Sequence, residues 1–209
     1  MAETKAALGV YIDGFNLYHA IDKLRRPALK WLSLHALAKS FVGPTEELGQ
    51  IRYFTAIQNN VPVKADRHRQ FIEAQKAYGV DVQLSRFQKT MKICSTRGGG
   101  CAFQEEKQTD VKLCAAVLTD AYTGSVTRFV LVTADSDQVP TVEALRAMGR
   151  HVTIAAPPGR KDVARELGSK ADAVLEITEG RLGACLLPRS VYAPRDGKFI
   201  AACPATYVG

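Results

Sequence analysis

Short apolar runs alternate with amphipathic stretches along most of the chain, and this alternation constrains the fold more than any other feature. The runs are short and rich in β-branched residues, whereas the stretches between them carry apolar residues at helical spacing. Strands are expected at 7–12, 51–57, 80–87, 128–132, 151–156 and 173–177, and helices at 15–26, 33–41, 64–78, 108–122, 139–148 and 161–169. Strands separated by helices predict an α/β fold, a three-layer α/β/α sandwich with a mainly parallel central sheet.

Two parts of the chain fall outside this alternation. Residues 88–107 form one long connection, and long loops in compact domains are usually functional lids or mobile. The tail from Gly180 contains three prolines and reads as irregular. Since 209 residues suit one domain of ordinary size, we expect a single domain over 1–179 and a C-terminal extension over 180–209 that packs on or near the core.

The sequence has no hallmark of a membrane or secreted protein. No stretch reaches the roughly 18 apolar residues that a membrane span needs, and the N-terminus lacks the pattern of a signal peptide. The five cysteines are an odd number without CxxC spacing, so they read as reduced thiols. Cys94 and Cys101 resemble a zinc knuckle only loosely, because the two further ligands that such a site needs are missing. We expect a soluble, cytoplasmic protein and leave open whether it forms a homo-oligomer.

The net charge of +7 suits a polyanionic partner such as RNA. Four basic residues lie just upstream of Asp110, where they could clamp an RNA backbone: Arg86, Lys89, Lys92 and Arg97. The alternative is a solvated basic loop. The glycines at 98–100 lack the Lys-Ser/Thr of a phosphate-binding loop, and no GxGxxG motif occurs, which argues against a nucleotide cofactor.

Aspartates stand where strands end or helices begin. Asp13 closes the apolar run GVYI, and Asp135 and Asp137 follow Thr133 at the end of FVLVT. Asp110 lies in the first turn of an expected helix. Ligands of open α/β sheets bind beyond the carboxyl ends of the strands, so we expect these four carboxylates to share one site.

Carboxylates brought together without a cation repel one another and are driven towards protonation. A bound divalent ion removes this conflict, and a site made of oxygen ligands favours Mg²⁺ or Mn²⁺. Such an ion can activate a water and stabilise the charge that develops on a phosphate. One of the carboxylates could also orient or deprotonate the attacking water.

Each of these residues also has a purely structural interpretation. Asp13 and Asp110 could be helix caps or first-turn acids, and Asp137 could cap the helix that follows it. Asn16 lies one turn beyond Asp13 and could aim its amide at the same pocket, or be an ordinary polar residue. Thr133 could add a hydroxyl to the site or fill the end of a strand.

Three segments, in order, resemble the signature segments of the NYN-domain family of PIN-like nucleases: YIDGFNLYHA, EKQTDVKLCAAVLTDAY and FVLVTADSDQVPTVEALRAMGRHVTI. The resemblance covers about residues 8–178. It implies a PIN-like parallel sheet flanked by helices, dependence on Mg²⁺ or Mn²⁺, and cleavage of RNA. Matched by motif, the family's site residues are Asp13, Asn16, Asp110, Asp135 and Asp137.

The chain departs from the family pattern at two places. Members often carry a further acid six residues after the position of Asp110, where this chain has Ala116. The Ser/Thr-Gly pair usual before the DSD motif is here Thr133-Ala134. The change at Ala116 leaves open the number of metal ions and the catalytic rate.

The sequence thus predicts a metal-dependent endoribonuclease that hydrolyses phosphodiester bonds of single-stranded RNA. One alternative is an RNA-binding or partner-binding module with weak or no catalysis, because Ala116 stands where family members often carry an acid. A more remote alternative is a phosphohydrolase of the haloacid-dehalogenase type with Asp13 as nucleophile. In this chain Asp13 is followed by Gly-Phe-Asn, which is not the arrangement that such enzymes carry.

Overall fold

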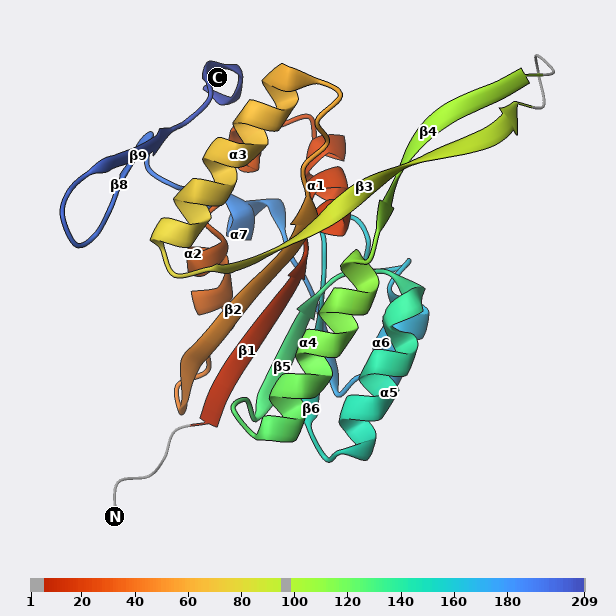
Figure 1. Cartoon of the computed structure of the whole chain (residues 1–209). Coiled ribbons are helices and arrows are strands. Elements are labelled where there is room, and N and C mark those ends of the chain that lie inside the picture. The colour runs from red at the N-terminus through yellow and green to blue at the C-terminus, as the bar shows by residue number, and fades with distance from the viewer. Residues whose placement is uncertain (1–5, 95–98, 209) are drawn as a thin grey trace.

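A seven-stranded sheet runs through the middle of the molecule in the order β4-β3-β2-β1-β5-β6-β7 (Figure 1). The computed structural model describes residues 6–94 and 99–208, and within 88–106 it describes only backbone. The strands are β1 (Ala6–Asp13), β2 (Glu46–Ala56), β3 (Asp81–Cys94), β4 (Gly99–Lys107), β5 (Arg128–Val132), β6 (His151–Ala156) and β7 (Ala173–Glu176). All neighbouring strands of this sheet are parallel except β3 and β4. The expected mainly parallel sheet is confirmed.

Helices cover both faces of the sheet, which confirms the three-layer α/β/α sandwich. One face carries α1 (Gly14–Lys23), α2 (Leu34–Lys39), α3 (Pro62–Ala77) and α7 (Glu179–Gly183), and the other carries α4 (Thr109–Thr123), α5 (Val139–Ala147) and α6 (Arg165–Lys170). Short 3₁₀ turns are η1 (Pro27–Lys30), η2 (Ser136–Gln138) and η3 (Ala205–Tyr207). No helix in the described part of the chain is both long and apolar enough to cross a membrane.

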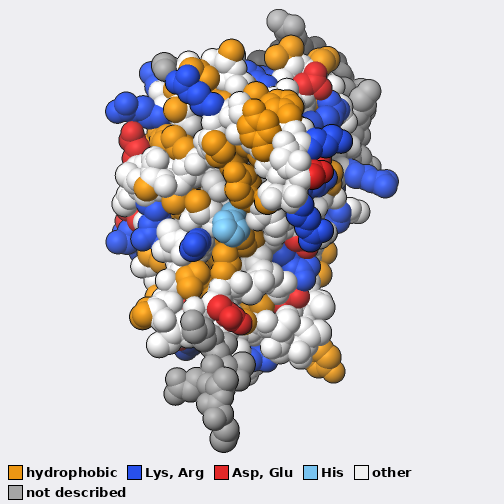
Figure 2. All heavy atoms as spheres, turned by 90° about the vertical axis from the view of Figure 1, so that its left-hand side faces the viewer, with side chains coloured by type: hydrophobic (Ala, Val, Ile, Leu, Met, Phe, Trp, Pro, Cys, Tyr) orange, Lys and Arg blue, Asp and Glu red, His pale blue; other side chains and the backbone are white. Residues whose placement is uncertain are grey.

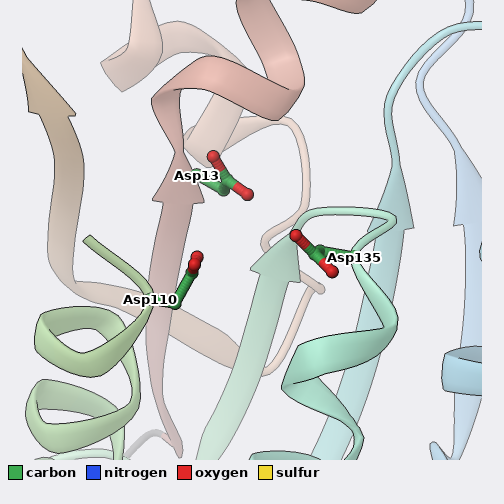
Figure 3. Close-up of side chains that lie close together, drawn as sticks. All are labelled: Asp13, Asp110 and Asp135. Carbon is green, nitrogen blue, oxygen red and sulfur yellow. The ribbon is translucent and has the colours of Figure 1, made fainter. Parts of the chain in front are cut away.

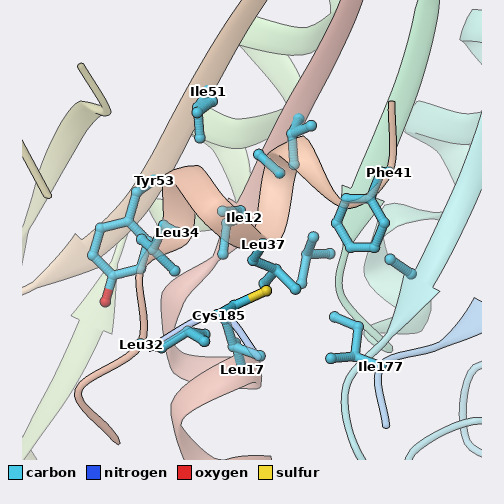
Figure 4. Close-up of a cluster of buried hydrophobic side chains, with 14 of the residues drawn as sticks. Ile12, Leu17, Leu32, Leu34, Leu37, Phe41, Ile51, Tyr53, Ile177 and Cys185 are labelled. Carbon is cyan, nitrogen blue, oxygen red and sulfur yellow. The ribbon is translucent and has the colours of Figure 1, made fainter. Parts of the chain in front are cut away.

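Strand β1 shows why the sequence buries both faces. Successive side chains of a strand point to opposite sides, so Val10 and Ile12 pack into the core under α1 and α2 while Tyr11 packs under α4. Figure 4 shows the first of these cores, where Leu17 of α1 and Leu37 of α2 meet Ile12. All three strand residues are fully buried, as expected for a central strand of a doubly covered sheet.

The strand order reverses beside β1. From β1 the chain adds β2 and β3 on one side, and it then crosses to add β5, β6 and β7 on the other. Such a reversal opens a crevice at the carboxyl ends of the two strands that flank it, and ligands of open α/β sheets bind there. In this chain those two strands are β1 and β5, which end at Asp13 and Val132.

The prediction of a long loop over 88–107 is wrong, because most of this segment forms a β-hairpin. Strands β3 and β4 pair antiparallel from Arg86 opposite Lys107 to Cys94 opposite Gly99. The hairpin extends well beyond the helices that cover the sheet (Figure 1). The side chains of Lys89, Lys92, Arg97, Cys94 and Cys101, on which an RNA clamp and a zinc site were considered, lie outside the described residues.

The C-terminal tail is more regular than its sequence suggests. After α7 it forms a small antiparallel sheet of β8 (Ser190–Tyr192) and β9 (Phe199–Ala202). Val191 and Ala201 pack with Ala74 of α3 and with Trp31, whose Nε1 donates to the Pro188 carbonyl oxygen at 2.8 Å. Figure 2 views this side of the molecule and shows hydrophobic side chains gathered along its middle, with Lys and Arg side chains on both flanks.

Candidate metal centre

Asp13 is held at the junction between β1 and α1. Its Oδ1 accepts the backbone N–H of Asn16 at 3.0 Å, which caps the first turn of α1. The next residue, Gly14, lies so close to β2 that an added Cβ would stand 2.6 Å from the Phe54 carbonyl oxygen. Only glycine fits at this close approach to β2, and its lack of a Cβ allows α1 to start immediately after the strand. Asp13 is only 6% exposed.

Asp135 is held by the loop that follows β5. Its backbone N–H donates to Thr133 Oγ1 at 3.1 Å, and its own Oδ1 accepts the Asp137 N–H at 3.0 Å. The second bond caps the 3₁₀ turn η2. Thr133 is fully buried, and its hydroxyl donates to Asp13 Oδ2 at 3.1 Å. A single hydroxyl therefore ties the carboxylate after β1 to the loop after β5.

Asp110 reaches the same place from the opposite layer. It lies in the first turn of α4, two residues after Gln108, whose backbone has a left-handed φ of 80°. That conformation is uncommon for a residue other than glycine and turns the chain sharply from β4 into α4. Asp110 is exposed, unlike its buried neighbour Thr109.

These three aspartates converge. One oxygen from each of Asp13, Asp110 and Asp135 lies within 4.8 Å of the other two. Figure 3 shows their side chains pointing toward one another from the end of β1, the start of α4 and the loop after β5. Asp137, expected as a fourth ligand, is not a member of this group among the described residues.

The clustering changes the acidity of the carboxyl groups. Burial raises the pKa of Asp13 to about 6, and the charges of Asp110 and Asp135 act in the same direction, against the lowering effect of the two hydrogen bonds. Burial and the charges of Asp135 and Asp137 raise the pKa of Asp110. Asp137 is therefore close enough to act electrostatically on the group. Carboxylates that repel one another in one place are favourable for binding a cation.

An open cleft surrounds the three carboxylates, and its other walls carry residues that sequence reasoning did not single out. They include His19 and Lys23 of α1 and Arg160, which follows β6. With Asn16, the α1 residues recur at i, i+3 and i+7, so helical spacing counted from Asn16 could have found them. Arg160 had no such signal. Thus cationic and titratable side chains border an acidic floor.

The remaining candidate residues occupy defined places. Asn16 lines the cleft, and its Oδ1 accepts the Ala134 N–H at 3.2 Å, which joins α1 to the loop after β5. Arg86 does not line the cleft but borders a separate depression with Phe87. Ala116 is partly buried against the core under α4 and α5. Six residues of helix place it about 9 Å along the axis from Asp110.

Comparisons with known proteins bear on this arrangement. The model of the NYN domain matches residues 7–178, which include the three converging aspartates. The chain is also similar to the 6-hydroxy-3-succinoylpyridine 3-monooxygenase HspA of Pseudomonas putida strain S16, with 28% identity over an alignment of 221 positions; the alignment covers 87% of this chain and 70% of that protein. The family match spans most of the chain and agrees with the parallel sheet and the acidic cluster. This chain belongs to the NYN-domain family of PIN-like ribonucleases.

Proposed function

We propose that this protein is a metal-dependent endoribonuclease that hydrolyses phosphodiester bonds of single-stranded RNA. The observation that carries the proposal is the convergence of Asp13, Asp110 and Asp135 to within 4.8 Å at the crevice beside β1. In this proposal the catalytic domain spans 1–179. The cytoplasmic location expected from the sequence stays a prediction.

A divalent cation fits the group on chemical grounds. The three potential ligands are carboxylate oxygens, which Mg²⁺ and Mn²⁺ prefer. Burial is the main cause that raises the pKa of Asp13 and Asp110, and the neighbouring carboxylates act in the same direction, so a bound cation would favour their charged forms. We therefore assign Asp13, Asp110 and Asp135 as the metal ligands and place Asp137 beside them.

A bound Mg²⁺ or Mn²⁺ would supply charge stabilisation and a more acidic water for the attack on phosphorus. The residues of the chain set the geometry. Each oxygen of Asp13 accepts one hydrogen bond, from the Asn16 N–H or from Thr133, and keeps a lone pair free for a ligand. Asn16 and Thr133 thereby act as positioning residues, since each also binds the loop that carries Asp135.

The cleft wall supports a phosphate-bearing substrate. Lys23 and Arg160 offer positive charge beside the carboxylates, and His19 offers a ring that can donate to a phosphate oxygen. We propose that these side chains position the RNA backbone while Asp137, outside the ligand group, orients the attacking water.

The test is cleavage of a labelled single-stranded RNA with Mg²⁺ or Mn²⁺. The wild-type protein should cut it, and a chelator should stop the cutting. Asp110→Asn should reduce the rate by a factor on the order of 100 or more. Because Asp110 is exposed, this substitution should leave the fold intact. The matched control is Asp162→Asn, an exposed aspartate outside the cleft. If the protein binds RNA but does not cleave it with any metal tested, the alternative of a non-catalytic binding module, suggested by Ala116, would be favoured.

The name of the Pseudomonas putida relative supports a second candidate, oxygenation of a small heteroaromatic compound. The observation that favours it is a cavity with aromatic walls beside the acidic cleft. Monooxygenation places one atom of dioxygen in the substrate and reduces the other to water, so the assay must supply a reductant. Incubation with 6-hydroxy-3-succinoylpyridine, isotopically labelled dioxygen and a nicotinamide reductant should consume the compound and place one labelled oxygen atom in a product if this candidate holds. An unchanged substrate would reject it for this compound.

A further inference from the structure

A second cavity lies on the other side of Phe15 from the acidic cleft, between α1, α3 and the end of β2. Its walls include the rings of Tyr18, Tyr53, Phe71 and Tyr207. Its volume is about 150 Å³, and a cavity of about that size accommodates a single benzene ring. The walls and the volume thus suit one flat aromatic ring.

The charged residues around this cavity are cations. Lys30, Lys64 and Arg67 contribute to its lining, and among the described residues that line it none is acidic. Asp22 pairs with Lys30 from outside the lining, and its carboxylate also interacts electrostatically with Lys64. Among the described residues, Arg67 forms no ion pair with a carboxylate. The three carboxylates of the acidic cleft have the opposite charge, so they suit a cation whereas this cavity suits an anion.

Arg67 is only partly satisfied by the protein. Its Nη1 donates to Thr206 Oγ1 at 3.0 Å, and its guanidinium lies 5.8 Å from the centre of the Tyr207 ring. Its Nε, however, is buried without a hydrogen-bond partner in the described structure. A buried donor left without a partner is costly, and a small shift of the guanidinium toward an anion in the cavity would satisfy it.

The inner wall is polar but uncharged. His68 lines the cavity, and burial lowers its pKa to about 4, so its ring is neutral near pH 7. One ring nitrogen, Nε2, lies 3.3 Å from Thr55 Oγ1. Neutral polar groups on one side and cations on the other suit a ring with a polar edge and an anionic substituent.

The C-terminal extension completes this cavity. Tyr207 belongs to η3, beyond the residues 7–178 that the family model matches. Its ring lies 6.0 Å from Lys30 Nζ, and Lys30 also lies 5.4 Å from the ring of Tyr18. The cavity is therefore built in part from residues outside the region that the chain shares with its family.

We propose that this cavity binds a planar, single-ring aromatic molecule that carries an anionic group, with Arg67 and Lys64 at the anion. Two sources share this chemistry. One is a pyrimidine nucleotide, free or within RNA, and the other is a small aromatic carboxylate. The site stands apart from the proposed nuclease activity, because its occupation requires neither metal nor cleavage.

The test is ligand binding to the full-length protein in the presence of a chelator. Binding is measured by amide chemical shifts in NMR and by calorimetry. The probes are benzoate, nicotinate and uridine 5′-monophosphate, with nicotinamide as the uncharged match of nicotinate. We expect at least one anionic probe to bind with a dissociation constant below about 1 mM and to shift amides of α1 and α3. Nicotinamide should bind at least about tenfold more weakly than nicotinate, if nicotinate is the ligand that binds.

Variants locate the site. Arg67→Gln should weaken binding about tenfold or more, and Ala65→Leu should fill the cavity and abolish binding. Lys64→Gln tests the charge at an exposed position where folding is not at risk, and Lys39→Gln is the control outside the cavity. Binding of uridine 5′-monophosphate alone would assign the site to a pyrimidine nucleotide, and binding of carboxylates alone would assign it to a small aromatic carboxylate. No binding up to about 10 mM, or binding unchanged in Arg67→Gln and Lys64→Gln, would overturn the proposal.

Discussion

The hydroxyl of Thr133 donates to Asp13 Oδ2 at 3.1 Å, across the gap between the ends of β5 and β1. The same oxygen accepts the Asp135 N–H, so one buried side chain sets the relative position of two of the three converging carboxylates. Neither strand end could hold this geometry alone. The acidic centre therefore depends on the pairing of β1 with β5, and its properties can be tested through the residues that connect the two strands.

Replacing this hydroxyl should disturb the centre more than the fold. Thr133→Val removes a bond that lowers the pKa of Asp13, so the acid limb of the pH–rate profile for RNA cleavage should move to higher pH. We expect a rate loss of about tenfold at pH 7 and a stability loss of about 1–2 kcal/mol. The control is Thr153→Val, at a buried strand position whose hydroxyl has no hydrogen-bond partner among the described residues. It should leave both the rate and the stability unchanged. Equal effects of the two substitutions would contradict this role of Thr133.

Asp13 should make the metal-free protein less stable as pH rises. Its pKa is about 6 in the folded state, above the ordinary value of 3.8 for an aspartate, so the folded state binds the proton more tightly. The contribution favours the folded state below about pH 4 and is lost as pH rises to about 6, a change on the order of 3 kcal/mol. Asp13→Asn should therefore become more stable relative to wild type by about that amount between pH 4 and pH 7, in chemical denaturation with a chelator. Exposed Asp162→Asn should give no such trend.

Metal affinity should fall as the solution is made acidic. Asp13 must lose its proton to bind a cation, so below about pH 6 the Mn²⁺ affinity should drop by about tenfold per pH unit. Calorimetry at several pH values, in buffers of different ionisation enthalpy, would also count the released protons. Asp110→Asn should abolish the rise in Tm that Mn²⁺ causes, whereas Asp137→Asn should only reduce it, because Asp137 stands outside the converging group. The reverse order would show that the ligand group is assigned wrongly.

A different buried aspartate should affect stability alone. Asp120, a residue of α4, accepts a hydrogen bond from the Tyr11 hydroxyl at 2.8 Å and another from Arg52 Nη2 at 2.8 Å. Burial raises the pKa of Tyr11, so this hydroxyl keeps its proton and stays a donor. Asp120→Ala leaves Arg52 with its weaker partners, Asp81 at 3.6 Å and Gln50 at 3.3 Å, and should cost about 1–3 kcal/mol, whereas Tyr11→Phe should cost about 1 kcal/mol. Mn²⁺ affinity should be unchanged in both. A loss of affinity in folded Tyr11→Phe protein would link this network to the centre.

The buried part of the fold could be read from the sequence because its elements have strong patterns. The apolar runs at 128–132 and 151–156 coincide with β5 and β6, since central strands bury both faces. Gly124 ends α4 with a positive φ of 71°, as its position predicts. The β3–β4 hairpin was harder to foresee, because its dense basic residues favour a loop. The alternation of Phe87, Met91 and Ile93 before the glycines at 98–100 was nonetheless a hairpin signal.

The candidate site was partly readable for a similar reason. Strand ends and helix starts located Asp13, Asp110 and Asp135, which do converge. The position of Asp137 depends on the η2 turn, where residues two apart lie about 240° round the axis, and sequence spacing does not reveal that divergence. The structural reading of Asp13 as a helix cap is also correct, so in this residue capping and the acidic site coincide. Arg160 became visible only when the loop after β6 was placed.

The most direct test of the central claim, that three aspartates form a divalent-metal centre, is the anomalous diffraction of a crystal grown with Mn²⁺. We predict one strong peak in the cleft, within about 2–2.5 Å of an oxygen of each of Asp13, Asp110 and Asp135. The peak should vanish in crystals of Asp110→Asn. A peak elsewhere on the protein, with the three carboxylates still facing an empty cleft at saturating Mn²⁺, would contradict the claim.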